Sequence, residues 1–116
     1  MPTFVIGSTA DFRSRPLTEV SLPSGLELAV VHIDGELRVL HGVCPHVGGP
    51  LGQGELVEGM VVCPVHGWPF DPHDGRTPMH PYVRVACFES HEAEGQLVVT
   101  VADPQAIEDL SSLPEG

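Results

Sequence analysis

Short apolar segments rich in Val, Ile and Leu recur along the chain, and turn residues separate them. Residues 27–33 predict a strand, and Asp34-Gly35 joins it to a second strand over residues 36–41, which is the pattern of a β-hairpin. Further strands are predicted over residues 4–7, 18–22, 55–57, 60–63, 82–89 and 96–102. The pattern as a whole predicts an all-β domain of short antiparallel strands.

The segment 82–89 alternates most clearly of all. Val83, Val85 and Cys87 fall on one face of this predicted strand, because successive side chains of a strand point to opposite sides. A small thiol beside two valines is typical of a buried residue that packs without reacting. We therefore expect Cys87 to be buried and inert.

Two stretches rich in Gly and Pro, residues 42–54 and 63–81, interrupt the strands and predict two long loops. Each contains a Cys-Pro pair and a histidine.

The length of 116 residues suits one domain. We expect that domain over residues 1–102, with the two loops side by side at one end. Residues 103–116 form an acidic C-terminal tail, with a weak helical turn at 107–110.

The charge is strongly acidic. Sixteen Asp and Glu residues face five Arg residues, which gives a formal net charge of −11. Nucleic-acid binding needs a basic face, so this class of function is excluded. An acidic surface keeps a protein soluble and also attracts basic partner surfaces, and the composition leaves both interpretations open.

The sequence predicts a cytoplasmic protein. Its apolar runs are all shorter than the roughly 20 residues of a membrane span. The first residues lack the basic and apolar regions of a signal peptide. Of three cysteines, two fall in a metal-binding pattern and leave Cys87 alone, so no intrachain disulfide is expected once a metal is bound.

The candidate chemistry lies in the two loops. Cys44 and His46 form a C-x-H pair, and Cys63 and His66 form a C-x-x-H pair. Sixteen residues separate His46 from Cys63. Thiolate and imidazole both bind transition metals. Structural zinc accepts two Cys and two His, but zinc fingers pair like with like around a short helix. A 2Fe–2S cluster held by four cysteines needs one cysteine more than the chain has, whereas a cluster with two Cys on one iron and two His on the other fits directly.

The stretches CPHVGGPLGQG and VVCPVHGWPFD resemble the cluster-binding boxes of Rieske proteins, most closely the ferredoxin components of bacterial aromatic ring-hydroxylating dioxygenases. The resemblance is specific over residues 42–78. It implies a Rieske fold of stacked antiparallel sheets with a two-loop cluster-binding subdomain. It also implies that Cys44 and Cys63 bind the buried iron of a 2Fe–2S cluster, and that His46 and His66 bind the outer iron at the tip.

Other positions depart from the high-potential branch of that family. The resemblance places Gly49 and Val65 where that branch has a pair of disulfide-bonded cysteines, so that disulfide is absent. Trp68 and Phe70 stand where its Ser and Tyr donate hydrogen bonds to cluster sulfur. Such hydrogen bonds stabilise the reduced cluster, so their absence predicts a low reduction potential.

The remaining candidates have ordinary structural interpretations. We expect Trp68 to pack beneath the loops, and the glycines Gly48, Gly49 and Gly67 to let backbone N–H groups approach sulfur or to form turns. The other histidines lack ligand spacing and are expected to be surface or core residues: His32, His41, His73, His80 and His91.

A cluster alone transfers one electron, and the chain has no dinucleotide fingerprint and no room for a mononuclear iron domain. The resemblance implies a non-enzymatic carrier, a monomer that takes electrons from a flavoprotein reductase and delivers them to a terminal oxygenase of aromatic catabolism. Two alternatives stay open: a small subunit of an assimilatory nitrite reductase, and a zinc-stabilised interaction module. Docking is expected at an apolar loop tip inside an acidic rim. The tip residues are Pro45, Val47, Pro50, Val65 and Trp68, and the rim residues are Glu55, Glu58, Asp71 and Asp74.

Overall fold

The computed structural model describes residues 3–23, 25–44, 49–65 and 67–100. Eleven strands, one short α-helix and one 3-10 turn make up this part of the chain. Their bounds are β1 Thr3–Ser8, α1 Thr9–Arg13, β2 Leu17–Ser21, β3 Glu27–Ile33, β4 Glu36–His41, η1 Leu51–Gln53, β5 Glu55–Val57, β6 Met60–Val62, β7 Pro69–Phe70, β8 Arg76–Thr77, β9 His80–Arg84, β10 Cys87–Ala93 and β11 Gln96–Thr100.

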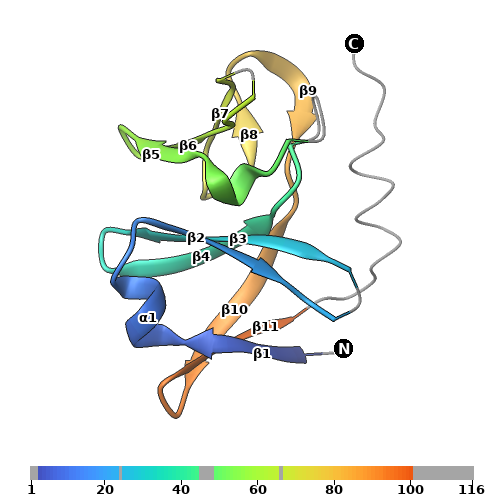
Figure 1. The fold of residues 1–116 in the computed structure, drawn as a ribbon. Helices are drawn as coiled ribbons and strands as arrows, with labels where there is room; N and C mark the ends of the chain where they lie inside the picture. Colours follow the sequence, from blue (N-terminus) through green and yellow to red (C-terminus); the bar gives the residue numbers. More distant parts are fainter. Residues whose placement is uncertain (1–2, 24, 45–48, 66, 101–116) are drawn as a thin grey trace.

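All strand pairs are antiparallel, as the alternation predicts. The largest sheet has the order β1-β11-β10-β4-β3-β2, so both chain ends of the domain meet at its β1-β11 edge. A three-stranded sheet β5-β6-β7 and a two-stranded sheet β8-β9 complete the fold. We call the part that carries these two small sheets the loop subdomain, residues 49–65 and 67–85. It lies above β3 and β4 in Figure 1.

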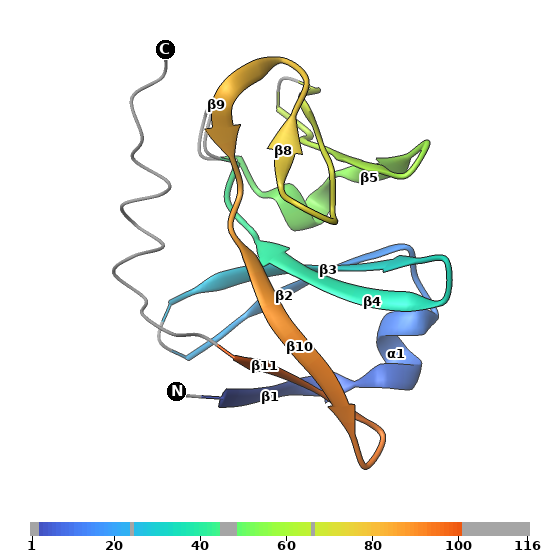
Figure 2. The ribbon, with the colours of Figure 1, turned by 180° about the vertical axis from the view of Figure 1, so that it is seen from behind.

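The large sheet curls because β10 serves two layers. Its first residues pair with β4, at Cys87↔Leu40 and Phe88↔Val39, and the rest of the strand pairs with β11. Figure 2 shows β10 crossing from the level of β9 down to β11. The result is three stacked layers: the loop subdomain, the β2-β3-β4 layer, and the β1-β11 layer with α1. The prediction of stacked antiparallel sheets is confirmed.

Strand β3 lies between two cores, which explains its continuous apolar sequence. Ala29 and Val31 pack upward into a cluster with residues of the loop subdomain and with both loop cysteines. Leu28 and Val30 pack downward with Phe12 of α1 and with strand β11. The period of two places alternate side chains in opposite layers. The upper core is therefore also the floor of the candidate site.

Three hairpins turn on two residues that both have positive φ, the geometry of a type I′ turn. They are Asp34-Gly35, Glu58-Gly59 and Glu94-Gly95. The sequence pattern predicted the first as the turn of a β-hairpin, and the other two lie between segments predicted as strands. The five-residue helix α1 was not predicted. Within the described residues no helix is long and apolar enough to cross a membrane. The predicted tail over residues 103–116 and its helical turn lie outside the described residues.

Candidate metal centre

Cys44 lies at the base of the first loop, just after β4. Its backbone N–H donates to the carbonyl of Gly49 at 2.8 Å, and Val43 forms an isolated bridge with Pro50. The two ends of the loop are therefore fastened together, with Cys44 on the inner side. The residue is 1% exposed. His46 lies outside the described residues.

Cys63 lies at the base of the second loop, just after β6. Its N–H donates to the carbonyl of Trp68, and its carbonyl accepts from the N–H of Gly67, both at 2.9 Å. Gly67 has a φ of +72°, in the left-handed region that favours glycine. This tight closure also leaves Cys63 only 1% exposed. His66 lies outside the described residues.

The two loops touch each other at Gly49. A methyl group added at Gly49 would lie 2.6 Å from Cγ2 of Val65 and 3.1 Å from Sγ of Cys63. No real Cβ tolerates the first distance, so the glycine lets the first loop approach the sulfur of the second. Gly67 differs, because an added methyl there meets nothing within 4 Å. Close approach explains Gly49, whereas turn formation explains Gly67.

The contact between Gly49 and Val65 also agrees with the resemblance of the two loops to the Rieske boxes. The added methyl would lie 3.3 Å from Cβ of Val65. The two Cβ atoms of a disulfide lie roughly 3.5–4.5 Å apart. These two positions are therefore close enough for the disulfide of the high-potential branch, which this chain cannot form.

Both cysteines lie in one apolar core, and neither is part of a disulfide. Phe70 is fully buried in the same core, and Trp68 packs against it, as predicted. Two buried thiols on adjoining loops fit the thiolate half of a Cys₂His₂ donor set. No group of three or more metal-ligating side chains gathers among the described residues, which do not include His46 and His66. The complete ligand set thus stays a prediction.

His41 ends β4 and is buried beneath the first loop. Its backbone N–H donates to the carbonyl of Ala86 at 2.8 Å. Burial lowers the pKa of its imidazole below the usual range, although the carboxylate of Glu27 opposes this shift. At neutral pH the side chain is therefore uncharged. Of the other non-motif histidines, His73 and His91 are exposed, and His32 and His80 are half-buried.

The prediction that Cys87 is buried was wrong. The prediction treated residues 82–89 as one continuous strand. In the structure β9 ends at Arg84 and β10 begins at Cys87. Val83 and Val85 remain buried, whereas Cys87 is exposed beyond the break. Desolvation by its surroundings, followed by the charge of Asp74, still raises the pKa of the thiol to about 11. The thiolate is the reactive form, so this raised pKa disfavours reaction of the exposed thiol at neutral pH.

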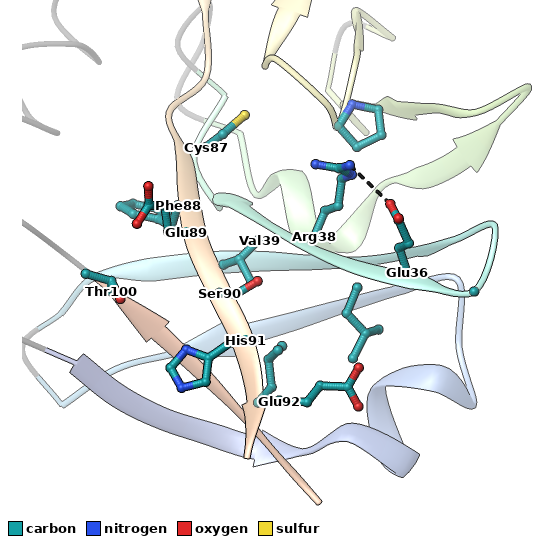
Figure 3. Close-up of a pocket in the computed structure, with 14 residues that line it drawn as sticks. Glu36, Arg38, Val39, Cys87, Phe88, Glu89, Ser90, His91, Glu92 and Thr100 are labelled. Carbon is teal, nitrogen blue, oxygen red and sulfur yellow. Dashed lines mark hydrogen bonds and ion pairs between the residues drawn. The ribbon is translucent and has the colours of Figure 1, made fainter.

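A cavity of about 770 Å³ opens below Cys87, where β4 and β10 diverge (Figure 3). Its carboxylates Glu36, Glu89 and Glu92 outnumber its single guanidinium, Arg38, which pairs with Glu36 at 3.1 Å. Neither of the paired loop cysteines lines it. The cavity is separate from the candidate metal centre.

A small antiparallel β domain with two buried thiols at the bases of adjoining loops fits the class of proteins that bind a metal centre through cysteine. The family model of the Rieske [2Fe-2S] domain matches residues 3–89. The chain belongs to the Rieske family, and its cofactor is a Rieske-type 2Fe–2S cluster.

Curated relatives share this region within larger proteins. Chlorophyllide a oxygenase of Chlamydomonas reinhardtii is 35% identical over 91 residues, which is 71% of this chain and 14% of that protein. The oxygenase component of the 3-ketosteroid-9-alpha-monooxygenase of Mycobacterium tuberculosis is 44% identical over 50 residues, 43% of this chain and 13% of that protein. The chain spans about a seventh of the length of these relatives.

Solved structures of similar size show the same fold. The ferredoxin of Sphingomonas yanoikuyae B1 superposes with a TM-score of 0.77 at 22% identity, covering 87% of this chain and 100% of that chain. The putative NADH-dependent nitrite reductase small subunit of Mycobacterium tuberculosis gives a TM-score of 0.76 at 22% identity, covering 88% and 97%. The ferredoxin of the carbazole 1,9a-dioxygenase of Nocardioides aromaticivorans IC177 gives 0.74 at 20% identity, covering 85% and 97%.

Proposed function

We propose that the protein is a one-electron carrier that takes electrons from a flavoprotein reductase and delivers them to a terminal oxygenase. The observation that carries this proposal is the meeting of two loops that bury Cys44 and Cys63 at one end of the domain. Cys44, His46, Cys63 and His66 would hold the cluster. When bound, the cluster supplies a site that gains and loses a single electron.

The loops do the remaining work in this proposal. The backbone hydrogen bonds at Cys44 and Cys63 close the two loop bases, and both thiols lie in the same core. The surrounding core, with Phe70 at its centre, keeps water away from the thiolate side. In this proposal His46 and His66, which follow their cysteines by two and three residues, would hold the outer iron, and a partner that docks at the loop tip would receive the electron there.

A ring-hydroxylating dioxygenase is the partner that we favour. The ferredoxin of the carbazole 1,9a-dioxygenase matches this chain over nearly its whole length. The nitrite reductase small subunit is the second candidate, since it covers the chain equally well. The curated relatives, in which a similar segment belongs to an oxygenase component, favour an oxygenase in the electron path.

Reconstitution tests the proposal. The purified holoprotein is reduced, mixed anaerobically with a candidate oxygenase or nitrite reductase catalytic subunit, and followed by stopped-flow absorbance. We expect rapid oxidation of the cluster by an oxygenase and product formation when a flavoprotein reductase and NADH are added. A colourless protein that contains zinc would overturn the cofactor assignment. Transfer to the nitrite reductase subunit alone would favour the second candidate.

A further inference from the structure

The hairpin of β8 and β9 has an unusual register. Thr77 pairs with His80 around a two-residue turn, but the next registered pair is Arg76 with Arg84. Two residues on β8 therefore span five on β9, and residues 81–83 form a bulge. Bulges redirect side chains and are common beside functional sites. Here the bulge leaves Tyr82, the only tyrosine of the chain, 76% exposed.

Hydrogen bonds hold this exposed segment in place. The backbone N–H of Tyr82 donates to Nδ1 of His80 at 3.2 Å, and the two rings meet edge to face with centroids 5.9 Å apart. At the turn, the N–H of Met79 donates to the hydroxyl of Thr77 at 3.2 Å. Met79 is itself 56% exposed. The apolar side chains are thus presented on an ordered hairpin, which lowers the entropic cost of binding a partner.

The inner side of the same strand forms a wall of the candidate metal centre. Val83 and Val85 are buried in the core cluster that contains Cys44 and Cys63. Because successive side chains of a strand point to opposite sides, Tyr82 and Arg84 lie on the outer side of that wall. The N–H of Val85 donates to the carbonyl of Gly75 at 2.8 Å and fastens the end of the hairpin. A partner on this outer face would therefore lie close to the cluster.

The charge of the hairpin opposes the charge of the molecule. Residues 75–88 contain two arginines and no Asp or Glu, in a chain of net charge −11. Arg76 and Arg84 are exposed, lie opposite each other in register, and form no ion pair within the described part of the chain. Like charges placed directly opposite destabilise a strand pair. The nearest carboxylate in sequence, Asp74, accepts the backbone N–H of Arg76 at 2.9 Å.

We propose that the outer face of this hairpin, formed by Arg76, Met79, Tyr82 and Arg84, docks against an acidic face of the electron-transfer partner. The inference rests on the proposed function. Tyr, Met and Arg are the residue types enriched in protein interfaces, and Tyr and Arg dominate their binding energy. An anionic partner would also offset the repulsion between the two arginines.

The first arm of the test uses inorganic oxidants and needs no partner protein. Reduced holoprotein gives one electron to hexacyanoferrate(III), which becomes hexacyanoferrate(II), and the second-order rate is measured at low ionic strength. Arg76→Ala and Arg84→Ala should each slow this rate at least about twofold more than Arg15→Ala. Arg15 is an exposed arginine beyond α1, so the control variant has the same net charge. With the cation hexaamminecobalt(III) as the oxidant, Arg76→Ala and Arg84→Ala should each react faster than Arg15→Ala.

The second arm uses the oxygenase that wild type reduces most rapidly in the reconstitution. Arg84→Ala and Tyr82→Ala should each raise the dissociation constant of the complex about tenfold, while Tyr82→Phe recovers most of the loss. Val5→Ala, which trims an apolar side chain that is 57% exposed on the distant strand β1, should change nothing. Visible spectra of all variants should match wild type.

The outcomes separate the two proposals. If wild type reduces no oxygenase, the proposed function fails. The rates with the two inorganic oxidants then show by themselves whether the hairpin face is cationic. Equal rates for all three arginine variants with both oxidants would overturn the inference. So would an oxygenase that binds Arg84→Ala more tightly than wild type, because a basic partner surface gains from the loss of a positive charge.

Discussion

At the scale of single residues, two sulfur atoms determine what the protein can bind. Cys44 and Cys63 are each 1% exposed in one core, whereas Cys87 lies outside it. Substitution of either buried cysteine by Ser should abolish the electron paramagnetic resonance signal of the reduced Rieske cluster, because the buried iron then lacks one of its two thiolate ligands. His46→Ala and His66→Ala should do the same. Cys87→Ser should leave the signal unchanged, and a lost signal in that variant would mean that the ligand assignment is wrong.

The reduction potential depends on what surrounds those sulfurs. Phe70 is fully buried in the core that contains Cys44 and Cys63, and Trp68 packs against the same core. Neither side chain has a hydroxyl that could donate a hydrogen bond to cluster sulfur. We expect a midpoint near the low end of the Rieske range, roughly −150 mV at neutral pH. Trp68→Ser combined with Phe70→Tyr should raise it, because hydroxyl donors stabilise the reduced cluster. Protein-film voltammetry measures both values.

Phe88→Tyr is the matched control for that experiment. It adds the same hydroxyl to a half-buried phenylalanine that packs against the lower core, away from the cysteines. Its potential should equal that of wild type. A wild-type midpoint above about +100 mV, well inside the upper part of the Rieske range, would contradict the argument.

Sequence alone singled out Cys44 and Cys63, the two cysteines that the structure buries in one core, because their spacing is that of metal ligands. Two loops that each carry a Cys-Pro pair and a histidine together supply four donor groups for one metal centre. The burial of Cys87 was predicted wrongly because alternation reports the face of a strand only while the strand continues. The break after Arg84 arises where Val85 and Ala86 turn their backbones to Gly75 and His41, and such tertiary hydrogen bonds leave no trace in a local pattern.

At the scale of elements, strands with strong turn signals were located correctly. The predicted bounds of β3, β4 and β5 match the structure, since Asp34-Gly35 and Glu58-Gly59 limit the register of their hairpins. The strands β7 and β8 were missed inside a predicted loop, because two residues each carry no periodicity. Helix α1 was missed for a similar reason: five residues hold a single buried aromatic side chain, Phe12.

The contact between the two loops gives a test at this scale. Gly49→Ala should lower the free energy of unfolding of the holoprotein by about 1–3 kcal/mol, because its methyl group would overlap Cγ2 of Val65. Val65→Ala in the same chain removes that atom and should restore part of the loss. Denaturant unfolding of both single variants and the double variant gives the coupling energy.

Gly67→Ala is the control for this cycle. Its methyl group meets no atom, so the expected cost of about 1–2 kcal/mol comes from the positive φ alone. Val65→Ala should not relieve it. Equal coupling of Val65 to both glycines would contradict the assignment of Gly49 to close approach and Gly67 to turn geometry.

At the scale of the whole molecule, charged side chains and exposed apolar side chains are distributed differently between the loop subdomain and the other two layers. Among the described residues, the loop subdomain carries four of the five exposed large apolar side chains, Val57, Val65, Met79 and Tyr82. The stretches 42–54 and 75–88 contain no acidic residue. Most of the described acidic side chains lie in the other two layers, and those of the loop subdomain are Glu55 and Glu58 at the β5-β6 hairpin and Asp71 and Asp74 before β8. This arrangement, an apolar and locally cationic end on an acidic body, is typical of a transient docking protein.

Docking at the loop tip predicts a specific response to substitution and salt. Val65 is 53% exposed on the second loop, so Val65→Glu should place a charge in the contact and slow electron transfer to the oxygenase while the cluster spectrum stays unchanged. Val47→Glu is expected to act in the same way. Val5→Glu adds an equal charge at a site 57% exposed on β1, far from the tip, and should leave the rate near that of wild type.

Salt should act mainly on the encounter rate. The acidic rim attracts basic partner groups, and Arg76 and Arg84 of the β8-β9 hairpin attract acidic ones. Salt screens both attractions beyond a Debye length of roughly 8–10 Å. The second-order rate in stopped-flow experiments should therefore fall as ionic strength rises, whereas the first-order rate within the complex stays constant. If the acidity serves solubility alone and the tip only shields the cluster, rates will be flat with ionic strength and normal in Val65→Glu. That pair of results would refute docking at the tip, because a buried apolar contact cannot accept a carboxylate without loss.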